Sequence, residues 1–169
     1  MPSPETTRRV VICDASPLIF LAKLAGLELI QRVVPGRLVV LGCVVREVLS
    51  ERAGPDEVDR LRTWLQSVEV IEYEDSLFPT SVLSQSDRST LAWAVNHSAA
   101  WLVADERLLR RVARQRGIHV IGFCGILVKA VERGHLPARE ARAMLDAAVD
   151  QHGLRISVAL YRRIVEALV

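Results

Sequence analysis

The chain has 169 residues, of which half are hydrophobic and a quarter are charged, so it is long enough to bury one core and too apolar to be disordered. Its net charge of +2 permits contact with a polyanion without requiring it, and no apolar run approaches the roughly 20 residues of a membrane helix. Three cysteines without a CxxC spacing and four scattered histidines argue against a disulfide framework and a zinc site.

The start of the chain, residues 1–9, is polar and lacks the apolar stretch of a secretion signal. We therefore expect a single domain spanning residues 1–169, located in the cytoplasm and without a membrane segment.

The first half of the chain predicts alternating strands and helices. A β-branched strand at 9–14 ends in Asp14, and Ser16 and Pro17 are then expected to cap and begin a helix. The apolar spacing predicts the following further elements: helices 18–24 and 27–34, strand 37–41, helices 44–51 and 56–67, and a short strand at 68–71 that is suited to an edge.

The second half continues this alternation after a polar stretch at 72–85. The expected elements are helix 87–96, strand 101–104, helix 106–115, strand 118–121 and three helices from 125 onward, with breaks at 134–137 and 153. Apolar strands that alternate with helices predict a parallel sheet covered on both sides. The fold class is α/β, with a core at about 8–133 and a helical C-terminal extension at about 134–169.

Acidic residues follow the strands at the end where an open parallel sheet binds its ligands. Asp14 and the pair Asp105 and Glu106 come at the ends of two strands. Asp87 begins a helix just before the second of these strands, and Glu47 lies within a helix after the 37–41 strand. We expect that each of these residues can turn toward the same crevice.

Several carboxylates in one crevice would repel one another unless a cation neutralised them. Ligation by oxygen alone favours Mg²⁺ or Mn²⁺ over zinc, and such ions serve phosphodiester chemistry. Each acidic residue also has a structural explanation. Asp14 fits a turn, Asp87 a helix cap, Glu47 a solvated helix, and Asp105 with Glu106 a favourable pair in the first turn of a helix. The residues alone leave both explanations open.

Four local motifs contain these residues. Val10–Ile19 has an apolar strand followed by D-x-S, with Asp14 and Ser16, and Val44–Leu49 has the pattern V-x-x-E-[VL], with Glu47. The third and fourth motifs are Leu83–Ala94, which contains Asp87, and Leu102–Ala113, which contains Asp105 and Glu106.

In order and context these motifs, with the segment 117–127, resemble the acidic motifs of the PIN-domain superfamily, particularly its DUF3368-like branch. The resemblance implies a PIN-like three-layer α/β/α fold and Mg²⁺- or Mn²⁺-dependent hydrolysis of single-stranded RNA. It also implies the catalytic and metal-binding residues: Asp14, Glu47, Asp87 and Asp105, with Glu106 in reserve and Ser16 as a supporting hydroxyl.

The third motif departs from the family pattern, because Ser84 and Ser86 replace glycines and Asp87 replaces a glutamate. Phe123 also replaces a threonine in the glycine-containing segment that follows the fourth motif. These departures motivate an alternative, a catalytically weak PIN fold that binds RNA or a protein. Many similar proteins are toxins of VapBC-type pairs, which implies a small antitoxin as a possible partner. A dehalogenase-type phosphatase is disfavoured, because it requires D-x-D and position 16 is serine.

Two helices have faces suited to contact. The 106–115 helix carries arginines on one side, which we expect to bind RNA phosphates, namely Arg107, Arg110, Arg111 and Arg114. A solvated arginine face on a buried helix is the alternative. The last helix is more apolar than solvent exposure requires, which fits core packing first and a homodimer or an antitoxin surface second.

Overall fold

The computed structural model describes residues 9–50, 52–74 and 83–168, so residues 1–8 and most of the polar stretch at 72–85 lie outside its description. The expected parallel sheet is confirmed. Its five strands follow the order β3-β2-β1-β4-β5, and all neighbouring strands are parallel. The strands are β1 (Val10–Cys13), β2 (Arg37–Leu41), β3 (Glu69–Ile71), β4 (Trp101–Val103) and β5 (His119–Ile121).

The centre of the sheet is the most buried part of the chain. Val11, Ile12 and Cys13 of β1 have no exposed surface, because β1 has a strand on each side and helices on both faces. The outer strand β3 leaves Val70 46% exposed, which agrees with the expected edge position. The continuous apolar runs of β1 and β2 are thus explained by burial on both faces.

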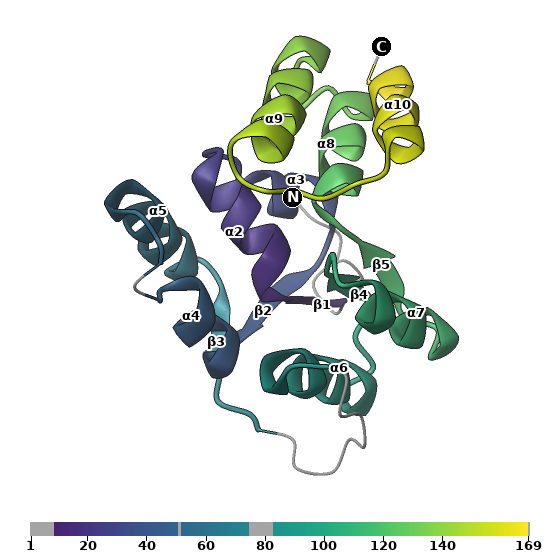
Figure 1. Ribbon diagram of the computed structural model, residues 1–169. Helices are drawn as coiled ribbons and strands as arrows, with labels where there is room; N and C mark the ends of the chain where they lie inside the picture. Colours follow the sequence, from purple (N-terminus) through teal and green to yellow (C-terminus); the bar gives the residue numbers. More distant parts are fainter. Residues whose placement is uncertain (1–8, 51, 75–82, 169) are drawn as a thin grey trace.

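Helices cover both faces of the sheet and form the expected three layers (Figure 1). Helices α6 and α7 lie on one face, where α6 contacts β1 and β2, and α8 lies on the other with α2 and α3. Helices α9 and α10 pack outside α8. The helices are α2 (Ala15–Lys23), α3 (Leu29–Val33), α4 (Gly42–Val48), α5 (Pro55–Leu65), α6 (Gln85–Asn96), α7 (Arg107–Gln115), α8 (Phe123–Glu132), α9 (Ala138–Asp150) and α10 (Val158–Ala167).

Helices α2, α6 and α7, which carry predicted site residues at their starts, begin at other residues than the sequence pattern predicts. Helix α2 begins at Ala15 with Asp14 as its N-cap, so the prediction that Ser16 caps it is wrong. Pro17 is tolerated there because the N–H groups of the first turn have no partner within the helix. Helix α6 is capped by Ser84 rather than opened by Asp87, and α7 has Glu106 as its N-cap.

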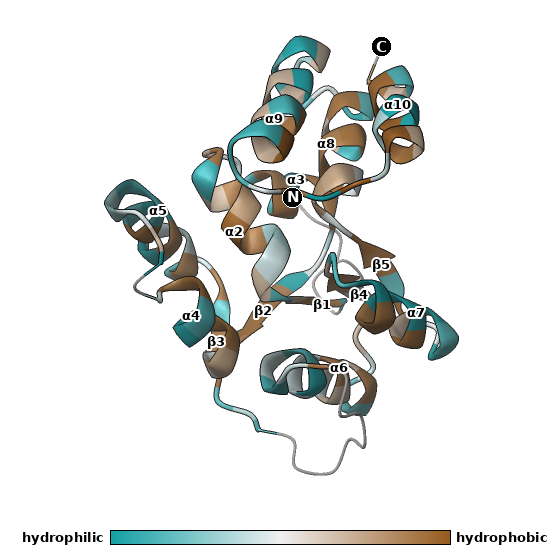
Figure 2. Ribbon diagram, in the orientation of Figure 1, coloured by the Kyte–Doolittle hydropathy of each residue, from teal (hydrophilic) through white to brown (hydrophobic). Residues whose placement is uncertain are grey.

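The distribution of hydropathy follows these layers. Hydrophobic residues gather on the strands and on α8, whereas the outward sides of α5 and α7 are hydrophilic (Figure 2). Within the described ranges, no helix is both long and apolar enough to cross a membrane.

Candidate active site

The strand order places a crevice beside β1. The chain runs from β1 outward to β2 and β3 on one side, and β4 and β5 occupy the other side, so the order of strands reverses between β1 and β4. Ligands of open α/β sheets bind at such a point, beyond the carboxyl ends of the strands. Asp14 follows β1 directly, and its N–H donates to the carbonyl of Val103 at 2.9 Å. The backbone therefore holds Asp14 next to the end of β4, where Asp105 follows.

A pocket of about 610 Å³ opens at this place. It brings together all the acidic residues predicted from the sequence, and we call it the acidic pocket. The predicted site residues that line it are Asp14, Ser16, Glu47, Asp87, Asp105 and Glu106. The remaining wall includes Phe20 from α2 and the segment Gly153–Arg155 between α9 and α10.

Asp14 is the most deeply buried carboxylate of the pocket, with 2% of its surface exposed. Although it occupies the N-cap position of α2, its side chain makes no capping bond, and its Oδ1 atom is buried without a hydrogen-bond partner. Burial raises its pKa well above the usual value, and so do the negative charges of Asp87, Glu47 and Asp105. A hydrogen bond from the backbone of Ala15 opposes this shift. Asp14 is thus a buried acid in a negative environment.

Asp105 is held by one of its two carboxylate oxygens. Oδ1 accepts a hydrogen bond from the N–H of Phe123 at 2.9 Å, whereas Oδ2 is buried and has no partner. Burial raises the pKa of Asp105, while the Phe123 N–H and the positive charge of Arg110 lower it. A side chain at Gly122 would overlap both Asp105 Oδ1 and the Arg110 guanidinium. Glycine at position 122 therefore lets these two groups approach the start of α8.

The serines of the third motif connect α4 and α6. Ser86 Oγ donates to Glu47 Oε2 at 2.6 Å and lies 3.1 Å from Ser84 Oγ. Ser84 in turn accepts a bond from the N–H of Asp87 at 3.1 Å, and its own N–H donates to Asp87 Oδ2 at 3.4 Å. The two serines that replace glycines thus cap α6 and orient Glu47, and the Asp87 side chain takes part in the cap.

The side chain of Glu106 also caps a helix. Its Oε2 accepts a hydrogen bond from the N–H of Leu109 at 2.5 Å and caps α7, so one oxygen of the reserve ligand is already used. Ser16 lines the pocket from the first turn of α2.

Across the part of the chain that the structure describes, no three Asp, Glu, His or Cys side chains converge as a ready-made ligand set for a metal ion. Two of the acidic side chains in the pocket, those of Asp87 and Glu106, are engaged in helix caps instead. The pocket nevertheless fits a divalent cation, because Asp14 and Asp105 each keep a buried oxygen without a partner. Such oxygens are the ligands that Mg²⁺ and Mn²⁺ prefer.

A larger pocket of about 910 Å³ continues from the acidic pocket, and the two share Asp105, Leu154 and Arg155. We call it the basic groove, because its lining includes five basic residues: Arg107, Arg110, Arg114, Lys129 and Arg155. It runs between α7, α8 and the segment that leads into α10. A negatively charged strand could therefore lie in the groove with one end at the carboxylates.

The four arginines predicted on α7 do not behave alike. Arg107 and Arg114 are exposed and line the basic groove, whereas Arg111 is exposed but is not part of the lining. Arg110 is half-buried and donates to the carbonyl of Ala104 at 3.1 Å, and burial, then the charge of Arg114, lowers its pKa. Arg110 thus contacts the region around Asp105 more than it presents its charge on an open surface.

Sequence reasoning missed two basic residues of the groove. Lys129 lies on α8 and Arg155 lies between α9 and α10. They come beside α7 only in the folded chain, where α10 packs against α8, so no local motif marks them. Both residues lie outside the acidic motifs, so the sequence gives no local indication that they line the groove.

Comparison with known proteins identifies the family of the chain. The DUF3368 family, described as a PIN domain, matches residues 10–168. A PilT N-terminus domain protein from the archaeon Sulfolobus solfataricus P2 has a similar structure, with a TM-score of 0.50 and 15% identity over 87% of this chain and 99% of that one. A domain of a functionally unknown protein from Methanocaldococcus jannaschii DSM 2661 has a TM-score of 0.48 and 14% identity over 68% of this chain and 90% of that one. No curated protein matches the sequence. With nearly its whole length covered by the family model, the chain belongs to the PIN-domain family.

Proposed function

We propose that this protein is a metal-dependent endoribonuclease that hydrolyses phosphodiester bonds of single-stranded RNA. Proteins of the PIN-domain family are generally nucleases that use divalent metal ions, and the acidic pocket has the groups such chemistry requires. The residues proposed to act there are those predicted from the sequence. They are Asp14 and Asp105 as the main ligands, with Glu47 and Asp87 beside them.

One observation carries this proposal. Asp14 and Asp105 follow neighbouring strands, line one pocket, and each has a carboxylate oxygen that is buried without a hydrogen-bond partner. Leaving a buried polar group unpaired costs about 1–3 kcal/mol, and more when it is charged. Two such oxygens in one pocket favour a bound cation as their missing partner.

A divalent cation held by Asp14 and Asp105 would supply charge neutralisation and an activated water. The chain's own residues then fix the geometry. Ser86 holds Glu47 through its 2.6 Å hydrogen bond, and the Phe123 N–H holds Asp105, so these carboxylates need little reorganisation. The exposed arginines of the basic groove would hold the RNA phosphates and offset their repulsion by the carboxylates.

Cleavage of a mixed pool of single-stranded RNA by wild type and by Asp14→Asn, each with Mn²⁺ or EDTA, tests the proposal. We expect cleavage only by the wild type with Mn²⁺. Asp59→Asn is a matched control, because Asp59 is an exposed aspartate on α5 outside the pocket lining. Full cleavage by Asp14→Asn, or cleavage that survives EDTA, would refute the assignment.

A second function is favoured by a specific observation. The side chains of Asp87 and Glu106 are engaged in helix caps, which fits a catalytically weak PIN fold that binds RNA or a protein. Titration calorimetry with Mn²⁺ separates the two. A metal site that Asp14→Asn removes supports the nuclease, and RNA binding without any metal binding supports the weak fold.

The toxin role stays a prediction, as do a small antitoxin partner and a homodimer. The surface that would serve either partner is α10, whose Val158 and Leu160 are 68% and 41% exposed. Co-expression with small proteins encoded beside this one would test the antitoxin, and measurement of the molar mass in solution would test the homodimer.

A further inference from the structure

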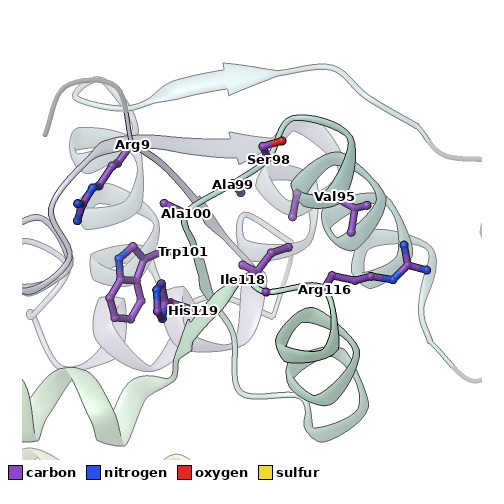
Figure 3. Close-up of a pocket in the computed structure, with 11 residues that line it drawn as sticks. Arg9, Val95, Ser98, Ala99, Ala100, Trp101, Arg116, Ile118 and His119 are labelled. Atoms are coloured by element: carbon purple, nitrogen blue, oxygen red, sulfur yellow. The ribbon is translucent and has the colours of Figure 1, made fainter. Parts of the chain in front are cut away.

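A third pocket, of about 500 Å³, opens at the opposite end of the sheet, where the strands begin. Figure 3 shows its lining, in which Trp101 and His119 lie side by side. Arg9 lines the pocket as well and is drawn above Trp101 in this view, whereas Arg116 lies on the far side and points away from the two rings. We call this the end pocket, and it plays no part in the chemistry proposed above.

The two rings of the end pocket form an open aromatic surface. Trp101 and His119 are the first residues of β4 and β5 and are paired in the register of these strands. Their ring centroids are 5.0 Å apart, with 33° between the ring planes. His119 is exposed and Trp101 is half-buried, whereas Trp93 is 3% exposed in its own stack with His97. Ring surface at Trp101 and His119 is therefore accessible to a ligand.

Trp101 also connects the end pocket to the substrate path. It lines both the end pocket and the basic groove, and the basic groove shares Asp105 with the acidic pocket. Trp101 begins β4 and Asp105 follows two residues after this strand ends, so at about 3.3 Å per residue the two lie at most about 13 Å apart. A short run of nucleotides can span this distance while its phosphates follow the basic groove.

The polar groups around the end pocket indicate how a ligand would be held. The N–H groups of Ala100, Ile118 and His119 donate to carbonyls of the chain, so they cannot read the edge of a base. Among the described residues, the side chain of Arg9 has no ion-pair or hydrogen-bond partner. The ring faces, the arginine charges and the hydroxyl group of Ser98 remain, and the first two suit a nucleotide without demanding a particular base.

We propose that Trp101 and His119 form a stacking platform for one base of single-stranded RNA, several nucleotides from the bond that is cut, with Arg9 contacting the adjoining phosphate. This inference rests on the proposed nuclease function and adds a binding site at the other end of the sheet. Stacking of a base on aromatic side chains contributes about 1–3 kcal/mol and is tolerant of sequence. The platform would thus give the enzyme a preference for length rather than for sequence.

An abasic scan tests the platform. A labelled single-stranded 12-mer and versions with one abasic nucleotide at each position are bound, without metal, to the Asp14→Asn protein, and affinity is read by fluorescence anisotropy. We expect one position, away from the cleaved bond, at which losing the base weakens binding by about tenfold. Adding His119→Ala should remove this loss, whereas Trp101→Phe, which keeps a ring, should retain it.

The control is His135→Ala, because His135 is an exposed histidine after α8 that lines neither the basic groove nor the end pocket. It should leave the scan unchanged. A flat scan, an equal loss in the His119→Ala protein, or binding of adenosine monophosphate as tight as that of the 12-mer would overturn the platform. Cleavage of the same 12-mer by the wild type is measured in parallel. A flat scan with intact cleavage removes only the platform, and absent cleavage with a His119-dependent scan removes only the nuclease.

Discussion

Replacing Asp14 by asparagine should stabilise the metal-free protein. The side chain is 2% exposed, and burial and three neighbouring carboxylates raise its pKa. Each unit by which folding raises a carboxyl pKa costs about 1.4 kcal/mol at neutral pH. Asparagine keeps the shape and removes the charge. The amide is still a buried polar group without a partner, so the gain comes from removing the buried charge and its repulsion by the neighbouring carboxylates; we expect about 1–3 kcal/mol, which is about 2–12 °C in Tm for a chain of this length.

Thermal unfolding followed by circular dichroism in EDTA at neutral pH measures this difference. Saturating Mn²⁺ should reverse the order, because only the wild type gains stability by binding the ion. Asp59→Asn, at an exposed position of α5, should melt within about 2 °C of the wild type. If Asp14→Asn melts below the wild type in EDTA, the carboxylate makes net favourable contacts, and the electrostatic argument for a cation fails.

Three further predictions follow from the same geometry. Because folding raises the pKa of Asp14 above its ordinary 3.8, the folded state holds more protons between the two values. The metal-free protein should therefore lose stability as pH rises from about 4 and melt higher at about pH 5 than at about pH 7.5, and equal Tm values would contradict this. Gly122→Ala should lower stability by about 1–3 kcal/mol in urea unfolding, because the added methyl group overlaps the Asp105 carboxylate. Arg107→Ala with Arg114→Ala should weaken binding of single-stranded RNA and reduce the slope of log K against log salt by about 1.4, and an unchanged slope would place the RNA elsewhere.

The sequence predicts the fold well, because its periodic patterns follow directly from burial. The apolar runs of β1 and β2 are buried on both faces, and this is why they lack the alternation of a half-exposed strand. The order of the strands has no such local cause. It depends on which helix covers which face, so the neighbours of β1 became known only from the structure.

That the acidic residues lie around one pocket could be predicted for a similar reason, since the carboxyl ends of parallel strands share one edge of the sheet. The sequence did not predict which carboxylate keeps an oxygen without a partner and which one caps a helix. Asp14 stands at an N-cap position without capping, whereas Glu106 caps α7. Both residues have extended backbone angles at the N-cap position, so the local backbone does not separate the two cases.

The wall that Gly153, Leu154 and Arg155 give to the acidic pocket makes the site depend on residues that lie far apart in the chain. Asp14 precedes these residues by most of the described chain, and contacts of such wide sequence separation form slowly. The five strands, with Asp14 and Asp105 at their ends, can be in place while the wall formed by residues 153–155 is still open. A chain that has not closed this wall would lack one side of the proposed site, so the nuclease function proposed above would require the completed fold.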